Sequence, residues 1–147
     1  MGGRGRKAPA WTVTIEGRMH RFETRIYYED TDLAGLVYYA NYLKFIERAR
    51  SEWIRAIGID QVALKSQGLV FVVRQLKADY LSPARYDDLL TIESRVDSLS
   101  PARLVLDQQV LRDGALLFQA QVTLVCINQA GRPVRLPAAL VAAMQPT

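Results

Sequence analysis

The sequence contains very few of the residues that build metal sites and disulfides. Among its 147 residues there are one cysteine, Cys126, and one histidine, His20. A single cysteine cannot form an internal disulfide, which excludes a disulfide-stabilised scaffold and is typical of a protein in a reducing compartment. We therefore expect a cytoplasmic protein. One cysteine and one histidine also fall short of the ligand set of a zinc site, so we expect no bound metal.

Long hydrophobic runs and nucleotide-binding loops are absent as well. No stretch approaches the roughly 20 consecutive apolar residues of a membrane-spanning helix, so we expect no membrane span. The phosphate loops G-x-x-x-x-G-K-[ST] and G-x-G-x-x-G do not occur, and neither does the nucleophile elbow G-x-S-x-G of serine hydrolases. No cofactor is therefore expected. With 50% hydrophobic and 23% charged residues, the composition is that of an ordinary globular chain.

The positive charge of the sequence is concentrated near its first residue. The formal net charge is +4, but Arg4, Arg6 and Lys7 lie within residues 1–10, which hold no acidic residue. The rest of the sequence contains 16 basic and 15 acidic side chains and is nearly neutral. This distribution argues against a nucleic-acid partner. We interpret residues 1–10 as a disordered, solvated leader and residues 11–147 as a single domain.

Hydrophobic periodicity predicts one long helix among several strands. Apolar residues recur at spacings of three and four over residues 40–57, which predicts a helix that ends at Gly58. β-branched and aromatic residues predict strands at 11–16 and 21–28. After the helix, alternating patterns predict four more strands, at 69–80, 88–98, 103–112 and 115–127, and a short helix at 137–144.

The connections between the last four strands are too short for parallel crossovers, so the sheet is expected to be antiparallel. Asp113-Gly114 is a two-residue hairpin signal between two of these strands. The helix is apolar over most of its surface, since Phe45 and Ile54 widen its apolar stripe. A helix of this kind must be covered on several sides. We therefore predict an α+β hotdog fold, in which an antiparallel β-sheet wraps around one long central α-helix.

Three carboxylates lie in the short loop before the predicted helix: Glu29, Asp30 and Asp32. Carboxylates near a helix N-terminus can cap the helix and favour its positive end. A carboxylate in this place can also act on a substrate whose developing negative charge faces the same helix end. The pattern of residues leaves both interpretations open. We expect His20 and Cys126 to be structural, because no local signature of a catalytic triad surrounds either of them.

The run from Tyr27 to Arg50, Y-Y-E-D-T-D-x-x-G-x-V-Y-x-x-x-Y-x-x-F-x-E-R-A-R, resembles that of hotdog acyl-CoA thioesterases of the 4-hydroxybenzoyl-CoA thioesterase superfamily. A second block, FVVRQLKADYLSPARYDDLLTIES (71–94), and the later LVC (124–126) are similar to the same family. The branch that these blocks resemble most is the one associated with the bacterial Tol-Pal system (YbgC-like). The resemblance extends from about Arg21 to Ala143.

This resemblance implies roles for particular residues. Asp32 corresponds to the catalytic carboxylate, acting as nucleophile on the thioester carbonyl or as general base for water. The thioester oxygen is implied to face backbone N–H groups where the central helix begins, which here means around Tyr39. The residues implied in substrate binding near the loop are Gly35, Val37 and Asn41. Asn41 either bonds to the site or caps the helix. The candidates for binding the nucleotide of CoA are Arg74, Arg85 and Arg103.

One departure from the branch concerns the helix start. Many members read V-Y-H where this sequence reads Val37-Tyr38-Tyr39, so a mechanism assisted by that imidazole is not available here. The backbone donor is unaffected, because every residue except proline carries an N–H. The tyrosine-rich stretch 38–42 resembles instead the W-Y-P-N-Y motif of the 4-hydroxybenzoyl-CoA enzymes.

The resemblance therefore implies an enzyme that hydrolyses acyl-CoA thioesters to free acid and CoA. Two alternatives remain: a thioesterase for aromatic acyl-CoA, and a non-catalytic acyl-binding or scaffold protein of the Tol-Pal envelope system. The family also implies a homo-oligomer, a dimer or a tetramer, whose acyl site lies between subunits. Association with envelope or phospholipid-synthesis proteins is a further expectation.

Overall fold

The computed structural model describes residues 19–145. Four helical segments and six strands make up this part of the chain. In chain order they are β1 (Met19–Arg25), the short 3-10 helix η2 (Tyr28–Asp30), α1 (Asn41–Ala56), α2 (Gln61–Ser66), β2 (Val70–Tyr80), β3 (Leu89–Leu99), β4 (Leu104–Arg112), β5 (Ala115–Ile127), β6 (Pro133–Val134) and α3 (Ala138–Met144).

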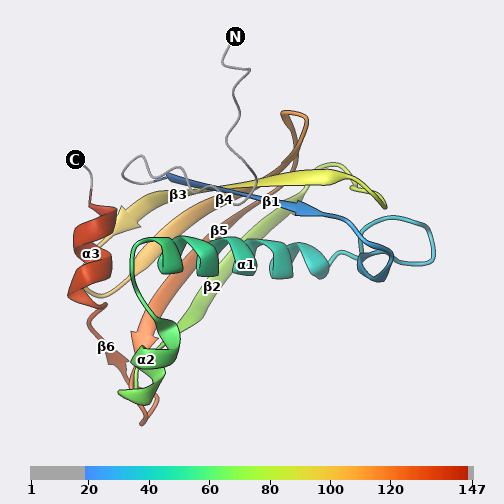
Figure 1. Ribbon diagram of the computed structural model, residues 1–147. Helices are drawn as coiled ribbons and strands as arrows, with labels where there is room; N and C mark the ends of the chain where they lie inside the picture. Colours follow the sequence, from blue (N-terminus) through green and yellow to red (C-terminus); the bar gives the residue numbers. More distant parts are fainter. Residues whose placement is uncertain (1–18, 146–147) are drawn as a thin grey trace.

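The strands form one antiparallel sheet in the order β1-β3-β4-β5-β2, with the short β6 paired to β5. Figure 1 shows the sheet curving around α1, which lies along its inner side, while α2 and α3 lie towards the C-terminal end of α1. The predicted α+β hotdog fold is confirmed. No helix within the described residues is long and apolar enough to cross a membrane.

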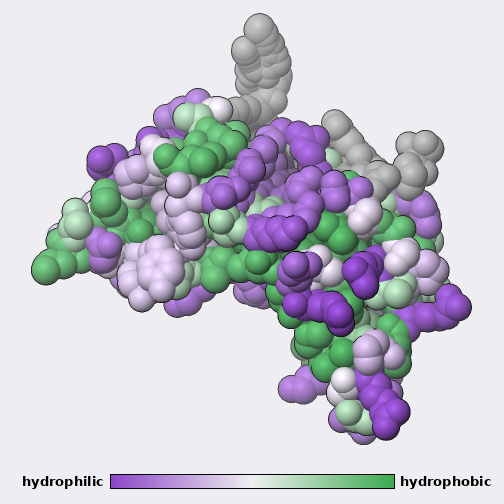
Figure 2. Space-filling view, turned by 180° about the vertical axis from the view of Figure 1, so that it is seen from behind, coloured by the Kyte–Doolittle hydropathy of each residue, from purple (hydrophilic) through white to green (hydrophobic). Residues whose placement is uncertain are grey.

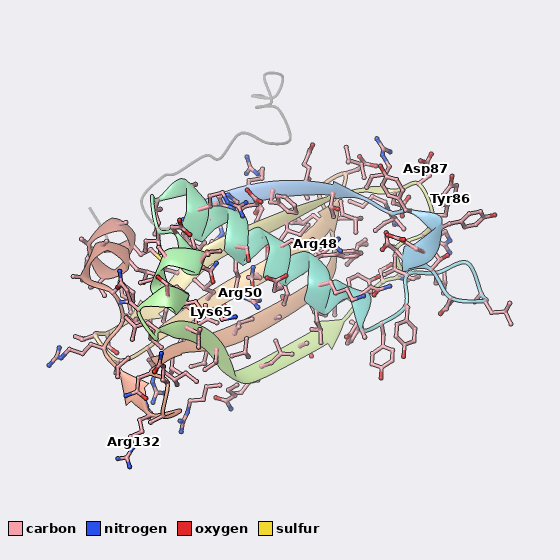
Figure 3. All side chains as sticks on the ribbon, turned by 60° about the horizontal axis from the view of Figure 1, so that its bottom comes forward. Arg48, Arg50, Lys65, Tyr86, Asp87 and Arg132 are labelled. Atoms are coloured by element: carbon pink, nitrogen blue, oxygen red, sulfur yellow. The ribbon has the colours of Figure 1, made fainter. Side chains whose placement is uncertain are left out.

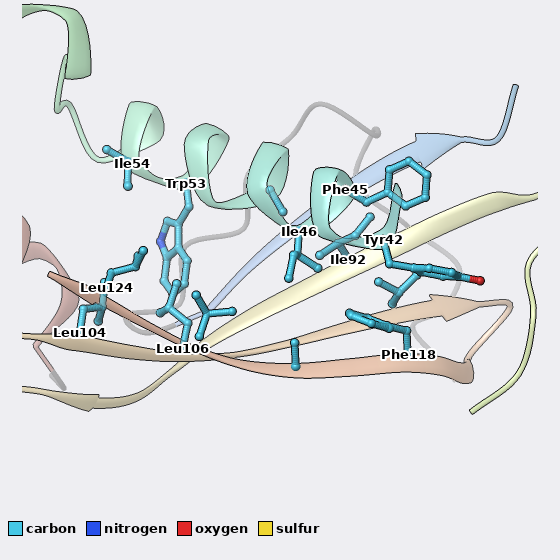
Figure 4. Packing of buried hydrophobic residues seen from close by; sticks show 14 of the residues in the cluster. Tyr42, Phe45, Ile46, Trp53, Ile54, Ile92, Leu104, Leu106, Phe118 and Leu124 are labelled. Atoms are coloured by element: carbon cyan, nitrogen blue, oxygen red, sulfur yellow. The ribbon is translucent and has the colours of Figure 1, made fainter. Parts of the chain in front are cut away.

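The core lies between α1 and the inner side of the sheet. The α1 side chains Phe45, Ile46 and Trp53 are at most 1% exposed and pack against inward-facing residues of β3, β4 and β5 (Figure 4). Burying one such side chain contributes roughly 1.5–3 kcal/mol, so this seam supplies most of the force that holds the helix on the sheet. The helix ends as predicted, with Gly58 just beyond the cap at a φ of +92°.

The opposite side of the sheet is polar. Figure 2, which views the molecule from behind, shows hydrophilic side chains over the middle of this face. On the outward side of β1 and β3, Arg21 and Glu93 form an ion pair whose charged atoms are 2.9 Å apart. The alternation predicted from the sequence is thus realised, with apolar residues towards α1 and polar residues away from it.

The β4–β5 connection is the predicted two-residue hairpin. Asp113 and Gly114 have φ values of +50° and +83°. Positive φ at both central residues is the geometry of a type I′ turn, whose twist matches that of the flanking strands. An Asp-Gly pair adopts it at low cost, so this turn helps to set the register of the two strands.

The structure differs from the predicted elements at β1 and α2, and also at β6 (Pro133–Val134), which was not predicted. The strand predicted at 11–16 lies outside the described residues, as does the leader 1–10. The strand predicted at 21–28 runs from Met19 to Arg25, because a 3-10 turn over Tyr28–Asp30 follows it. The helix α2 was not predicted, although the side chain of Asp60 caps it by accepting hydrogen bonds from the N–H groups of Val62 and Ala63.

Candidate active site

The loop between β1 and α1 is a tight hairpin built around Asp32. The N–H of Asp32 donates to the carbonyl of Leu36 at 2.8 Å, and the N–H of Gly35 donates to the carbonyl of Asp32 at 3.0 Å. Gly35 has a φ of +80°, a conformation that favours glycine, so its role in this structure is to close the turn. The carboxylate oxygen Oδ1 of Asp32 accepts hydrogen bonds from the N–H groups of Ala34 (2.9 Å) and Leu36 (3.3 Å).

The second carboxylate oxygen of Asp32 is not used by the loop. Among the described residues no hydrogen bond or ion pair reaches Oδ2, and the residue is exposed. The hydrogen bonds to Oδ1 hold the carboxylate in one orientation. Asp32 is therefore an oriented, accessible carboxylate with one free oxygen.

Asp30 has a structural role instead. Its Oδ2 accepts a hydrogen bond from the N–H of Tyr27 at 2.8 Å, which closes the turn after β1. Its carbonyl accepts two further hydrogen bonds at 2.9 Å, from the N–H of Tyr38 and from Nδ2 of Asn41. Asn41 is 8% exposed and does not cap the helix. These bonds fasten the Asp32 hairpin to the first turn of α1.

The start of α1 presents unsatisfied donors. No side chain caps the helix, and its N-cap residue is Ala40. Among the residues that the structure describes, the N–H groups of Tyr39 and Ala40 have no acceptor, whereas that of Asn41 donates to Tyr38. Two adjacent N–H donors at the positive end of a 16-residue helix form a site suited to a developing oxyanion.

Aromatic rings surround these donors. The side chains of Tyr38 and Tyr39 are 47% and 63% exposed, and their ring centroids are 5.1 Å apart. The ring of Tyr80, from the end of β2, lies 6.2 Å from that of Tyr39 and 4.9 Å from that of Phe118. A thioester bound at the helix start would therefore lie against an aromatic wall, part of which is continuous with the core.

Tyr42 supports this wall from the core side, where it packs against Tyr80 and Phe118. It is 3% exposed and stacks on Phe118 with a centroid separation of 5.0 Å (Figure 4). Its hydroxyl accepts a hydrogen bond from the N–H of Ala84 at 3.0 Å. Burial raises the pKa of the Tyr42 hydroxyl, so it stays neutral. Val37 also belongs to the core, at 6% exposed, and its N–H donates to the carbonyl of Ala84.

Of the three candidate arginines, only Arg85 lies beside the loop. It forms a β-bridge with Leu36, and its N–H donates to Oδ2 of Asp88 at 2.8 Å. The same Asp88 oxygen accepts a bond from Arg112. Burial alone would raise the pKa of the Asp88 carboxyl, but these two bonds outweigh it and lower that pKa below its usual value. Figure 3 shows the neighbouring Tyr86 and Asp87 at the end of the molecule opposite Lys65 and Arg132.

Arg74 and Arg103 lie away from the loop of their own chain. Arg103 precedes β4, at the end of β3 farthest from Arg85, and the eleven residues of β3 span roughly 35 Å. Arg74 occupies the bulge of β2, six positions before Tyr80. Both side chains are exposed and have no ion-pair partner among the described residues. The structure thus brings Asp32, Tyr39, Asn41 and Arg85 to one end and leaves these two arginines apart.

A family model for the thioesterase-like superfamily matches residues 27–144, which include the loop and α1. The chain belongs to this superfamily. Among curated proteins it is similar to the acyl-CoA thioester hydrolase YbgC of Escherichia coli O6:H1, with 40% identity over 126 residues that cover 84% of this chain and 94% of the relative. It is also 41% identical over 118 residues to the acyl-CoA thioesterase YbgC of Haemophilus influenzae, covering 79% of this chain and 87% of that one.

A solved structure of a probable thioesterase from Bartonella henselae superposes with a TM-score of 0.78 at 42% identity, covering 81% of this chain and 99% of that one. The predicted membership of the YbgC-like branch is confirmed by these relatives.

The sequence placed the backbone donors around Tyr39 without naming each one, and the N–H of Ala40, which adjoins that of Tyr39, is one that has no acceptor among the described residues. The contact of Tyr80 with the site was not predicted from the sequence. Its hydroxyl donates to the carbonyl of Tyr39 at 2.9 Å. The alternation of β2 places Tyr80 on the inner face, but its partner lies 41 positions earlier in the chain. Only the pairing of the strands brings the two together.

Proposed function

We propose that the protein hydrolyses acyl-CoA thioesters to free acid and CoA at the junction of the Asp32 hairpin and the start of α1. The observation that carries this proposal is a pair of groups in two segments that Asp30 joins by hydrogen bonds: a carboxylate oxygen and the N–H donors of a helix N-terminus, all without partners among the described residues. The curated relatives at 40% identity, which are named acyl-CoA thioester hydrolases, support a thioester hydrolase.

In the proposed reaction the N–H of Tyr39 holds the thioester oxygen as it becomes negative. Asp32 takes one of two roles. As a nucleophile its Oδ2 bonds to the acyl carbon and the carbon–sulfur bond breaks. The CoA thiolate takes up a proton from water, and the hydroxide that remains hydrolyses the mixed anhydride to the free acid and the Asp32 carboxylate. As a general base it removes a proton from water, the hydroxide adds to the acyl carbon, the carbon–sulfur bond breaks, and Asp32 passes the proton to the CoA sulfur.

The alternatives predicted from the sequence differ in substrate or in catalysis. A non-catalytic scaffold is not favoured, because the relatives are named as hydrolases and because Asp32 remains accessible. An aromatic acyl group would fit the ring faces of Tyr38 and Tyr39, but no comparison favours it over an aliphatic group. The deciding experiment measures free-thiol release from a panel of aliphatic and aromatic acyl-CoA substrates. No release from any member of the panel contradicts the proposal.

The active enzyme is further proposed to be a homo-oligomer, and specifically a tetramer. One edge of β2 pairs with β5 and the other pairs with nothing among the described residues. The strand also exposes Val73, Leu76 and Tyr80, at 47%, 38% and 47%. A free strand edge with exposed apolar side chains favours pairing with another copy.

If two copies join antiparallel along β2, the beginning of one strand lies beside the end of the other. Arg74, the fifth of the eleven residues of β2, then lies beside the middle of the neighbouring strand. This arrangement supports a role for Arg74 in binding the CoA held by the other copy. The same role is proposed for Arg103, which precedes β4, two strands away from β2 in the sheet. Arg85 is proposed to bind the CoA held by its own copy, the one that also supplies Asp32. Gly35 and Val37 contribute through the backbone of the hairpin.

The proposed setting is the cytoplasm, in association with the Tol-Pal envelope system and with envelope or phospholipid-synthesis proteins. The lone cysteine, Cys126, supports a reducing compartment, because it is buried and free. The link to the envelope rests on the YbgC-like branch alone. Co-purification of envelope or phospholipid-synthesis proteins with the intact chain tests this link, and their absence contradicts it.

A further inference from the structure

A single peptide unit at the start of α1 connects β2 to the oxyanion site. The hydroxyl of Tyr80, the last residue of β2, donates a hydrogen bond of 2.9 Å to the carbonyl oxygen of Tyr39. The same peptide unit carries the N–H of Ala40 at its other side. That N–H has no acceptor among the described residues.

Peptide geometry makes these two groups move as one. The peptide bond is planar and trans, so its C=O and N–H point in opposite directions within one rigid plane. A hydrogen bond that holds the Tyr39 oxygen therefore also fixes the direction of the Ala40 N–H. Donation to the oxygen also polarises the peptide and makes its N–H a stronger donor.

The Tyr80 hydroxyl is held in place by the core. Its ring makes edge contacts with Tyr42 at 5.5 Å and Phe118 at 4.9 Å between centroids, and these two residues are 3% and 0% exposed. Burial raises the pKa of the Tyr80 hydroxyl, and Tyr39 and Tyr42 raise it further, so the group stays protonated and can donate. Packing of the Tyr80 ring against the core thus fixes the hydroxyl that holds the Tyr39–Ala40 peptide.

We infer that Tyr80 is a positioning residue of the oxyanion site: its hydroxyl aims the Ala40 N–H as a second donor beside the Tyr39 N–H. This inference rests on the proposed thioesterase function and adds to it a donor and the side chain that orients it. It assigns to β2, a strand far from the catalytic loop in sequence, a direct influence on the rate of the chemical step.

The first test compares two variants that each lose one tyrosine hydroxyl, one within the aromatic wall and one outside it. Tyr80→Phe keeps the ring and frees the Tyr39–Ala40 peptide to tilt. Loss of one oxyanion donor costs about 10²–10³ in kcat, and because the Ala40 N–H is misdirected rather than deleted we expect a loss of roughly 10- to 30-fold, with KM within about twofold. Tyr86→Phe removes the hydroxyl of an exposed ring that stacks on Tyr28 and lies outside the aromatic wall, so we expect a kcat and a KM within about twofold of the wild type.

The second test is binding, which does not depend on turnover. One probe is an acyl-CoA analogue whose thioester is replaced by a trifluoromethyl ketone, which becomes a tetrahedral oxyanion when Asp32, or a water deprotonated by Asp32, adds to its carbonyl carbon. The matched probe is a CoA thioether without the carbonyl. We expect Tyr80→Phe to weaken the Kd of the ketone about tenfold and that of the thioether less than twofold, because only the first places negative charge at the donors.

The outcomes separate this inference from the proposed function. An active wild type whose Tyr80→Phe variant keeps its kcat, or loses affinity equally for both probes, overturns the positioning role alone. A wild type that releases no thiol from any acyl-CoA overturns the proposed function, and the positioning role with it. A lower kcat together with selective loss of ketone binding supports both.

Discussion

Arg50 of α1 and Gln108 of β4 are joined by a hydrogen bond of 3.0 Å between the guanidinium and the side-chain oxygen. Gln108 is completely buried, and its Nε2 donates to the Ile46 carbonyl at 3.0 Å and to Oγ of Ser94 at 2.9 Å. Burial lowers the pKa of the Arg50 guanidinium, an effect that Glu47 opposes. One glutamine thus connects the central helix, two strands and a partly desolvated cation.

Replacement of Gln108 by leucine tests this connection. Gln108→Leu leaves the Arg50 guanidinium and the Ile46 carbonyl without this partner, so we expect the free energy of unfolding to fall by about 1–3 kcal/mol. In the double variant Arg50→Met, Gln108→Leu the partly buried charge is also gone, and part of the loss should be recovered. Urea denaturation of the three proteins gives both values. Equal stabilities of the single and double variants would show that Arg50 finds sufficient solvent without Gln108.

Asp32→Asn should remove the activity while the fold remains. An asparagine Oδ1 can still accept from the N–H groups of Ala34 and Leu36, so the hairpin keeps its hydrogen bonds. Loss of the nucleophile or base should lower kcat by several orders of magnitude. The matched control is Glu29→Gln, an exposed acid in the same segment that has no hydrogen-bond or ion-pair partner among the described residues. It should stay within about twofold of the wild type. A folded Asp32→Asn variant that retains more than about a tenth of the wild-type kcat contradicts the assignment.

Tyr39 separates the contributions of backbone and side chain. Its ring is 63% exposed and its hydroxyl has no hydrogen-bond partner within residues 19–145, so Tyr39→Phe should change kcat by less than roughly tenfold, about 1.4 kcal/mol. Tyr39→Pro deletes the N–H donor itself and should be severe, although proline is well tolerated near a helix start. Both variants need the Tm and oligomer size of the wild type for the comparison to be valid. A hundredfold loss in the phenylalanine variant would assign the function to the phenol instead.

The long elements were predictable from the sequence because apolar residues recur in each of them at a regular spacing. The helix predicted at 40–57 is found at Asn41–Ala56, and the four strands after it differ from their predicted ranges by one residue at either end or less. The six-residue α2 is too short to show a period, so only Asp60 before it and Gly68 after it could have marked it.

The candidate site was predictable to a smaller extent. Asp32 and Tyr39 followed from a motif within one short segment, where spacing along the chain implies proximity. The contact between Tyr80 and Tyr39 depends on how β2 joins the sheet, and no local pattern contains that information. The same limit applies to the arginines, since the length of β3 separates Arg85 from Arg103. The burial of His20 in β1 was missed because the strand was expected to begin after it.

His20 should make the protein less stable in acid. It is 0% exposed, stacks on Trp53 with 5.9 Å between ring centroids, and neither of its ring nitrogens has a hydrogen-bond partner among the described residues. Burial lowers its pKa from 6.5 to about 4, and Glu52 partly opposes this. The unfolded chain therefore binds this proton more tightly than the folded protein does. The free energy of unfolding is undiminished by His20 above pH 6.5, and it falls by at most about 3 kcal/mol as the pH drops towards 4.

The variant His20→Phe isolates this effect. Phenylalanine keeps the stacking on Trp53 and cannot be protonated, so the difference in unfolding free energy between variant and wild type should grow between pH 6.5 and pH 4. Carboxylates such as Asp88 also lose stability in acid, but they titrate in both proteins and cancel in the difference. Urea denaturation at a series of pH values gives the curves. Parallel curves for the two proteins would mean that His20 is hydrated or charged in the folded state.

One edge of β2 has no partner strand within residues 19–145, which predicts that the protein is not a monomer. Leu76 lies on the inner face of this strand, opposite the buried Val122 of β5, yet remains 38% exposed. A second copy paired along β2 would cover it. Light scattering at micromolar concentration should therefore give a multiple of 16.6 kDa, and our proposal of a tetramer requires four copies.

Leu76→Glu should dissociate the assembly, because it places a charge in the interface, whereas the neighbouring Lys77→Ala, on the outer face, should not. If Arg74 of one copy serves the site of another, the dissociated variant should also show a raised KM for acyl-CoA. A monomer mass for the wild type rules out a shared site.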